Sequence, residues 1–63
     1  MVRKIEQFEL AASQDNIVPD EGQVFYFGEM EFSNWIVAIN EKGVIVEIFN
    51  MDHVSHIVLA KEV

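Results

Sequence analysis

The fold is decided by the stretch Trp35-Ile36-Val37-Ala38-Ile39, Asn40-Glu41-Lys42-Gly43, Val44-Ile45-Val46-Glu47-Ile48-Phe49. Two runs of mostly β-branched and aromatic residues flank a short polar segment that ends in glycine. Such runs favour strands, and Gly43 supplies the positive φ that follows a type I turn. The stretch therefore predicts a β-hairpin in which Gly43 has a structural role.

Further strands are predicted on both sides of this hairpin. Residues 24–32 have the same apolar and aromatic composition, and Ser33-Asn34 predicts a turn before Trp35. Gly28 inside this strand indicates a bulge or a close backbone approach. After the hairpin, residues 50–52 predict a turn and residues 53–60 a last strand. An antiparallel meander of four strands is the economical topology, because neighbours in sequence tend to pair.

The N-terminal segment, residues 2–12, is ambiguous. Ile5, Phe8 and Ala12 follow helical spacing, whereas Phe8, Leu10 and Ala12 alternate as in a strand. We therefore expect either a strand or a short helix that lies on the sheet.

A loop over residues 13–23 follows this segment. Asp15-Asn16 ends the first element, and Pro19-Asp20-Glu21-Gly22 predicts a turn in which the proline presets φ. The expected fold is a single small domain over residues 1–63 that is mostly β. Its four to five antiparallel strands form a curled sheet or a partial barrel.

Both faces of the predicted sheet are apolar. Successive side chains of a strand point to opposite faces. The register of the hairpin therefore assigns each side chain to a face, either with Ile39 opposite Val44 or with that pairing shifted by one residue. Both registers leave β-branched residues on each face. Either the sheet curls into a closed barrel, or a second chain buries one face. We predict a homodimer, because so short a chain has few residues with which to close a barrel.

The charge balance narrows the class of partner. The chain has 11 acidic residues, 4 lysines and arginines, and a net charge of −7. Nucleic-acid binding requires cations that displace counterions from phosphates, so direct nucleic-acid binding is not expected. A basic protein partner fits this charge, although the same acidity also serves solubility.

The composition also bears on the cellular location. Cysteine is absent, which excludes disulfides and thiolate metal sites and fits a reducing compartment. The first seven residues contain two cations followed by glutamate, unlike a signal peptide. No apolar run approaches the ~20 residues of a membrane span. We therefore expect a cytoplasmic protein that does not enter the membrane.

No pattern predicts catalysis, a metal or a cofactor. His53 and His56, three residues apart on a strand, point to opposite faces, and Ser55 between them has no base within reach. Glu29 and Glu31 share a strand face about 6.5 Å apart, a separation found in glycosidases. A chain this short has little material for a cleft that holds a sugar, so we do not expect an enzyme.

Glu29 and Glu31 also suggest a row of carboxylates that imitates a phosphate backbone, extended by Asp20, Glu21 and Glu47. In size and charge the chain is similar to phage-encoded inhibitors that mimic DNA, such as the uracil-DNA glycosylase inhibitors. That similarity rests on no aligned motif and assigns no residue. It implies an anti-defence inhibitor of a host or antiviral nucleic-acid enzyme. The alternative is a solvated edge that discourages aggregation.

The sequence thus predicts a homodimeric, acidic protein-binding module. Buried aromatic residues dominate interfaces, so Phe25, Phe27 and Trp35 are the expected anchors, with the core as the competing assignment. Two alternatives are a structural subunit of a larger assembly and a small-ligand-binding β-barrel. The acidic residues expected around the anchors are Asp20, Glu21, Glu29 and Glu31.

Overall fold

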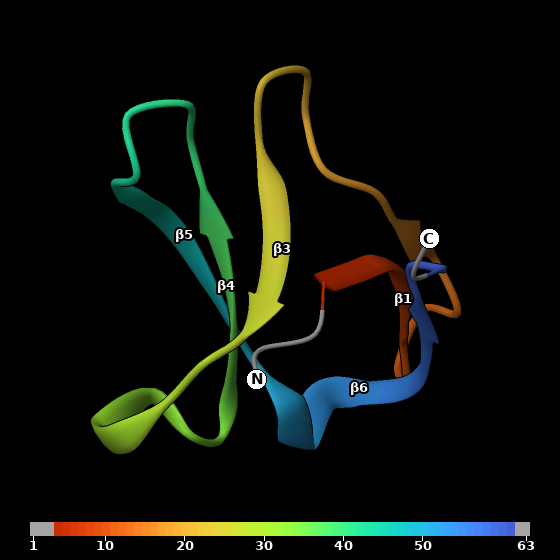
Figure 1. The fold of residues 1–63 in the computed structure, drawn as a ribbon. Coiled ribbons are helices and arrows are strands. Elements are labelled where there is room, and N and C mark those ends of the chain that lie inside the picture. Colours follow the sequence, from red (N-terminus) through yellow and green to blue (C-terminus); the bar gives the residue numbers. More distant parts are fainter. Residues whose placement is uncertain (1–3, 62–63) are drawn as a thin grey trace.

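The computed structural model describes residues 4–61, which form six strands and two short 3-10 turns. The sheet is antiparallel throughout, runs in the order β2-β1-β3-β4-β5, and carries β6 on β1. It curls into a half-barrel (Figure 1). Within residues 4–61, no helix is long and apolar enough to cross a membrane. The elements are β1 (Lys4–Leu10), β2 (Asn16–Ile17), β3 (Val24–Phe27), η1 (Met30–Phe32), β4 (Trp35–Ile39), β5 (Ile45–Asn50), η2 (Met51–His53) and β6 (Val54–Leu59).

The predicted hairpin is confirmed as β4 and β5. The Asn40 side-chain oxygen accepts hydrogen bonds from the backbone N–H groups of Lys42 and Val44, at 2.9 and 3.1 Å. Gly43 has φ +79°, the left-handed conformation that glycine adopts without steric cost. The polar loop thus fixes the hairpin, as expected from its composition.

The hairpin combines the side-chain faces of the two registers that the sequence allows. Ile36 lies opposite Phe49 and Val37 opposite Ile48, two residues away from the pairing of Ile39 with Val44, so these side chains keep the faces of the first register. Between Ala38 and Ile39 the register shifts, and Ile39 then lies opposite Ile45. The shift places one extra residue on β5, so Ile45 moves to the face of Ile39 and Val37.

The N-terminal element is a strand, so the helical alternative is wrong. The register with β6 shifts between Ile5 and Gln7, which places one extra residue on β1. This bulge lets Ile5 and Phe8, three residues apart, both point into the core, where they are 0% and 1% exposed. The apparent helical spacing is therefore a bulged strand. Residues 2 and 3 of the predicted segment lie outside the described residues.

The meander is confirmed for β3, β4 and β5, but the last strand departs from it. β6 begins at Val54 and pairs with β1 rather than with β5. The predicted loop over residues 13–23 contains β2, whose Ile17 lies opposite Phe8 of β1. The turn lies one residue later than predicted, because the Gln23 N–H donates to the Asp20 carbonyl at 3.0 Å and Pro19 precedes the turn.

The strand predicted over residues 24–32 ends at Phe27, and the remainder folds back as η1. A Cβ on Gly28 would overlap the Phe32 carbonyl oxygen, so the predicted close backbone approach is confirmed. Glu29 and Glu31 therefore do not share a strand face, and their predicted alternating row is wrong. The reversal requires glycine at position 28, a constraint that strand periodicity does not reveal.

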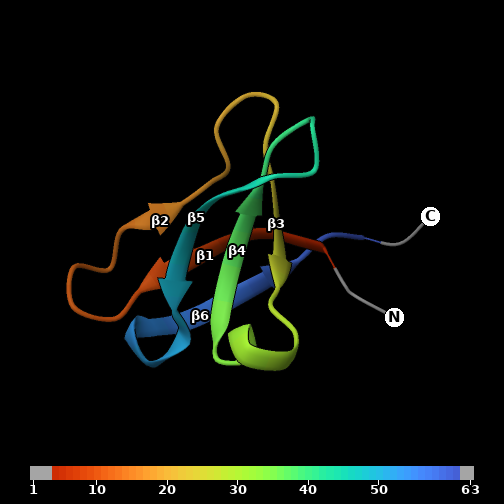
Figure 2. The same cartoon turned by 90° about the vertical axis from the view of Figure 1, so that its left-hand side faces the viewer.

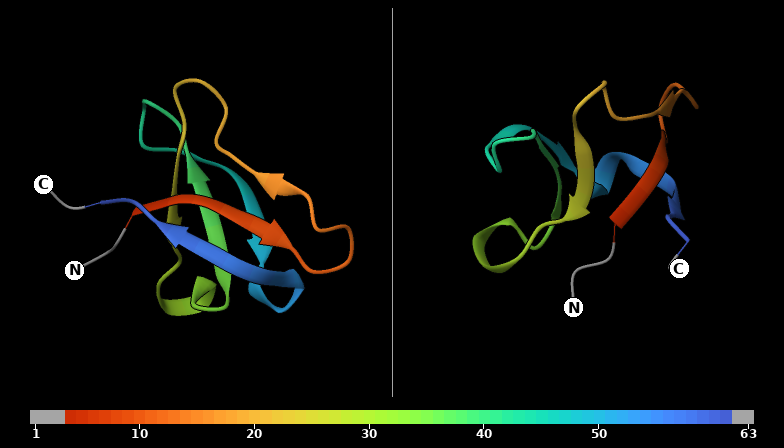
Figure 3. Two further views of the ribbon diagram at one scale, coloured as in Figure 1. Left: turned by 90° about the vertical axis from the view of Figure 1, so that its right-hand side faces the viewer. Right: turned by 45° about the horizontal axis from the view of Figure 1, so that its top comes forward.

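The core lies inside the curl, where three phenylalanine rings meet. The ring centroids of Phe8 and Phe25 are 5.3 Å apart, and Phe49 lies 4.9 and 5.8 Å from them. These rings come from β1, β3 and β5, with Ile36 and Ala38 of β4 buried among them. Strands β3, β4 and β5 form one layer, and β1 and β6 cross it, behind it in Figure 2 and in front of it in the left view of Figure 3. Curling thus buries one apolar face and leaves the other outside.

Candidate docking surface

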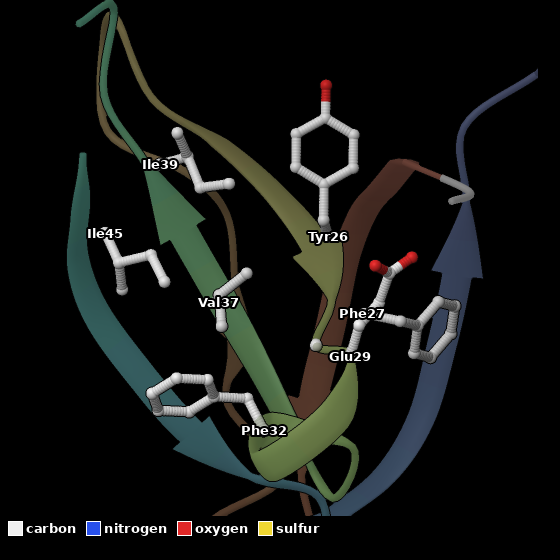
Figure 4. Close-up of a pocket in the computed structure, with 8 residues that line it drawn as sticks. Tyr26, Phe27, Glu29, Phe32, Val37, Ile39 and Ile45 are labelled. Atoms are coloured by element: carbon white, nitrogen blue, oxygen red, sulfur yellow. The ribbon is translucent and has the colours of Figure 1, made fainter. Parts of the chain in front are cut away.

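The outer face of β3, β4 and β5 carries an apolar groove of about 400 Å³. Its floor is Val37, which is 5% exposed and lies opposite Tyr26 on β3 and Ile48 on β5. The side chains of Ile39 and Ile45 stand beside Val37, and Phe32 stands at one end (Figure 4). The lining residues are Tyr26, Phe27, Gly28, Glu29, Phe32, Val37, Ile39 and Ile45.

The η1 turn builds one end of this groove. Gly28 lets the chain reverse after β3, and the reversal returns Phe32 to the outer face. Met30, at the start of the turn, has φ +56° and is 92% exposed. A left-handed conformation is strained for methionine, and a fully wet thioether side chain gains nothing from the fold. Strained and exposed apolar residues often belong to binding sites.

The groove continues onto β5, which is the last strand in the sheet order. Ile45 and Ile48 are 44% and 41% exposed, and Val44 and Val46 are exposed beside them. Among residues 4–61, no strand pairs with the second edge of β5. Exposed β-branched side chains along an open edge form a surface that proteins ordinarily cover.

The chemistry of the groove suits apolar contact. Among residues 4–61, the lining includes no histidine, serine, lysine or arginine, and Glu29 is its one carboxylate. Nucleophilic and acid–base catalysis need a reactive group beside a base or acid that orients it. The groove instead offers aromatic and branched aliphatic side chains that exclude water from a bound group.

The three predicted aromatic anchors occupy different places. Phe25 is 2% exposed in the core, so its competing assignment to the core holds and its ring is not available to a partner. Phe27 borders the groove but packs its half-buried side chain against the core. Trp35 is half-buried at the start of β4, opposite Asn50 and on the face of Val37. Of the three, Trp35 is therefore the one placed on the outer face by strand alternation.

The four predicted acidic residues fall into two pairs at opposite ends of β3. Asp20 and Glu21 precede this strand, whereas Glu29 and Glu31 follow it in the η1 segment (Figure 1). All four are exposed, and Glu29 lines the groove. Glu21 lies with Lys42 around a separate depression of about 260 Å³. The pairs do not form one continuous acidic row.

Several surface residues were not singled out as partner contacts in the sequence. Ile45 and Ile48 belong to the hairpin, whose sequence pattern predicts apolar side chains on both faces. That pattern is the sequence feature that indicates their exposure. Tyr26 follows from strand alternation with Phe25 in the core. Met30 and Phe32 had no such signal, because their positions depend on the reversal at Gly28.

The residues that suggested chemistry lie apart from the groove. His53 is in η2 and His56 in β6, and both are exposed. The Ser55 hydroxyl donates to the Glu9 carbonyl oxygen at 3.4 Å rather than to a histidine. Among residues 4–61, no group of three or more histidine, cysteine or acidic side chains is placed to hold a metal ion.

Comparison of the chain with protein-family models, with curated proteins and with solved structures gave no significant match. Its function is therefore inferred from the geometry of the surface.

Proposed function

We propose that this chain is a small protein-binding module that docks a partner on the outer face of β3, β4 and β5. The observation that carries the proposal is the apolar groove over Val37 and its continuation into exposed Ile45 and Ile48. Burying such surface contributes about 25 cal/mol per Å², which makes it a source of binding energy.

The interior of the curl supports a docking role over an internal ligand site. The rings of Phe8, Phe25 and Phe49 lie within 5.8 Å of one another, in the space that a barrel ligand would occupy. Small-molecule sites usually enclose most of the ligand surface. The outer groove instead opens onto the exposed side chains of β5, a shape that favours a larger partner.

The charge of the chain favours a basic partner. Among residues 4–61, ten residues are acidic. The lysines and arginines of that range are Lys4, Lys42 and Lys61. Opposite charges around an apolar centre accelerate association and select partners. Imitation of a phosphate backbone is not part of this proposal, because the predicted carboxylate row is divided between the two ends of β3.

The proposal is tested by capture from extracts of the native host with matched variants. Ile45→Glu places a charge in the groove wall, whereas Val18→Glu changes a similarly exposed residue beside β2, at the other end of the sheet order. We expect the wild type and Val18→Glu to retain a protein that Ile45→Glu loses. Titration calorimetry with the purified partner then measures the affinity. Equal capture by both variants would contradict the proposal.

A further inference from the structure

The unpaired edge of β5 has backbone groups that point away from β4. The Met51 N–H donates to the Asn34 carbonyl at 3.0 Å. Asn34 and Met51 are therefore a hydrogen-bonded pair that continues the β4–β5 ladder. Such pairs alternate along antiparallel strands. The backbone N–H and C=O groups of Phe49 and Glu47 therefore point to β4, and those of Ile48 point to the open edge. The Gly28 N–H, which donates to the Trp35 carbonyl at 2.9 Å, gives the same alternation on β4.

The side chains beside this edge alternate in character. Ile48 lies on the outer face with Val37, while Glu47 lies opposite Ala38 on the inner face yet is exposed. The exposed Asp52 follows the strand in η2, whereas the Glu41 carboxylate of the hairpin loop lies beside Gly22, which precedes β3. Lys42 is the one lysine or arginine between residues 40 and 53.

From this arrangement we infer that β5 accepts an extended segment of the partner as an added strand, with apolar residues beside Ile48 and a lysine or arginine opposite Glu47. The inference rests on the proposed docking function and names the chemistry of its partner. Main-chain hydrogen bonds supply affinity in strand addition, and the alternating side chains supply specificity. Directly opposite residues of unlike charge stabilise a strand pair, whereas like charges destabilise it.

Charge decides between such a segment and a second copy of the chain. A second copy brings another −7 and another Glu47 to the same edge. A cationic segment is attracted to Glu47 on the strand and to Asp52 just beyond its end. Electrostatic attraction between exposed groups weakens as salt is added, while repulsion between two acidic copies is relieved by salt.

The test uses a fluorescent peptide of about eight residues that alternates valine and lysine, a length typical of a strand. The comparison peptide alternates valine and glutamate. Binding is followed by fluorescence anisotropy, and the amide hydrogen exchange of the protein is followed by NMR. We expect the lysine peptide to bind, the glutamate peptide not to bind, and the Ile48 amide to exchange at least tenfold more slowly in the complex. The Phe49 amide, already bonded to β4, serves as the internal reference.

Two pairs of variants separate the backbone contribution from that of charge. Ile48→Pro removes the outward N–H, and proline is tolerated where a strand N–H faces solvent, whereas Ile48→Val retains the N–H and the branched side chain. We expect Ile48→Pro to bind the lysine peptide at least tenfold more weakly than Ile48→Val does. Glu47→Gln is expected to lower the affinity for the lysine peptide by up to about fivefold, and Glu47→Lys to lower it further. If Ile48→Pro does not fold, the wild-type exchange measurement decides alone.

Several results would overturn the inference. Peptide binding without slower exchange at Ile48, or equal binding of the glutamate peptide, would exclude a basic added strand. Slower exchange at Ile48 that grows with the concentration of the free protein would assign the edge to a second copy. If the lysine peptide fails to bind while host capture still depends on Ile45, strand addition fails and the proposed docking function stands.

Discussion

The rings of Phe8 on β1 and Phe49 on β5 meet edge to face, with centroids 4.9 Å apart and planes inclined at 65°. These strands do not pair, because β3 and β4 lie between them in the sheet order. The contact therefore crosses the inside of the curl and ties its two sides together. It leaves the opposite face of β4 and β5 outside, where the groove lies.

The Phe8–Phe49 contact predicts measurable energetic coupling. In a double-mutant cycle with Phe8→Leu and Phe49→Leu, we expect a coupling free energy of about 0.5–1.5 kcal/mol, as for other aromatic pairs. Urea denaturation supplies the free energies of unfolding. The control cycle pairs Phe8→Leu with Phe32→Leu on the outer face, where additive effects are expected. Equal coupling in the two cycles would mean that the rings do not hold the curl together.

Gly28 is expected to be required for the η1 turn. Gly28→Ala places a Cβ against the Phe32 carbonyl, and we expect the free energy of unfolding to fall by about 1–3 kcal/mol. Gly43 provides a contrast, because a Cβ there meets nothing within 4 Å but φ is +79°. Asparagine tolerates that conformation, so Gly43→Asn should be milder than Gly43→Ala, whereas Gly28→Asn should be no milder than Gly28→Ala. The reverse order would show that φ, not contact, limits position 28.

Met30 is expected to lower the stability of the fold while it serves binding. Relief of its left-handed conformation in Met30→Gly should raise the free energy of unfolding by about 0.5–1 kcal/mol, after the entropic penalty of glycine. Glu31→Gly in the same turn has no such strain to relieve and should be destabilising. Thermal denaturation of the two variants checks the difference. A stability of Met30→Gly at or below that of Glu31→Gly would remove the case for stored strain at position 30.

The homodimer predicted from the sequence stays a prediction. The exposed side chains of Ile45 and Ile48 lie on the outer face, so two copies would meet there and compete with a partner. Each copy carries −7, and salt screens their repulsion, so we expect sedimentation equilibrium to show more dimer as salt is added. Ile45→Glu should remain a monomer. A monomeric wild type at every salt concentration would rule out the dimer.

The hairpin and its two apolar faces were accessible to sequence reasoning. Gly43 and the β-branched runs define local geometry, and alternation then assigns Ile36 and Val37 to opposite faces. The mixed register was not accessible, because a bulge depends on how β4 and β5 pair rather than on local preference. The same limit made Ile5 and Phe8 resemble a helix.

The groove was only partly accessible. The excess of apolar side chains predicted an uncovered face, and Ile45 and Ile48 lie on it. Phe25 appeared equivalent to Phe27 in the sequence, but only the three-dimensional curl places its ring between Phe8 and Phe49. The division of the acidic residues into two pairs follows from the reversal at Gly28, a contact between backbone segments that composition does not encode.

The most direct test of docking on the outer face is an isoleucine-methyl NMR titration with the captured partner. Isoleucines are distributed over both faces, with Ile39, Ile45 and Ile48 on the outer face and Ile5 and Ile36 in the core. We predict that the three outer methyl signals shift and lose contact with solvent, while the two core signals stay within the small changes of an intact fold. Unchanged outer signals in the presence of a saturating partner would contradict the account.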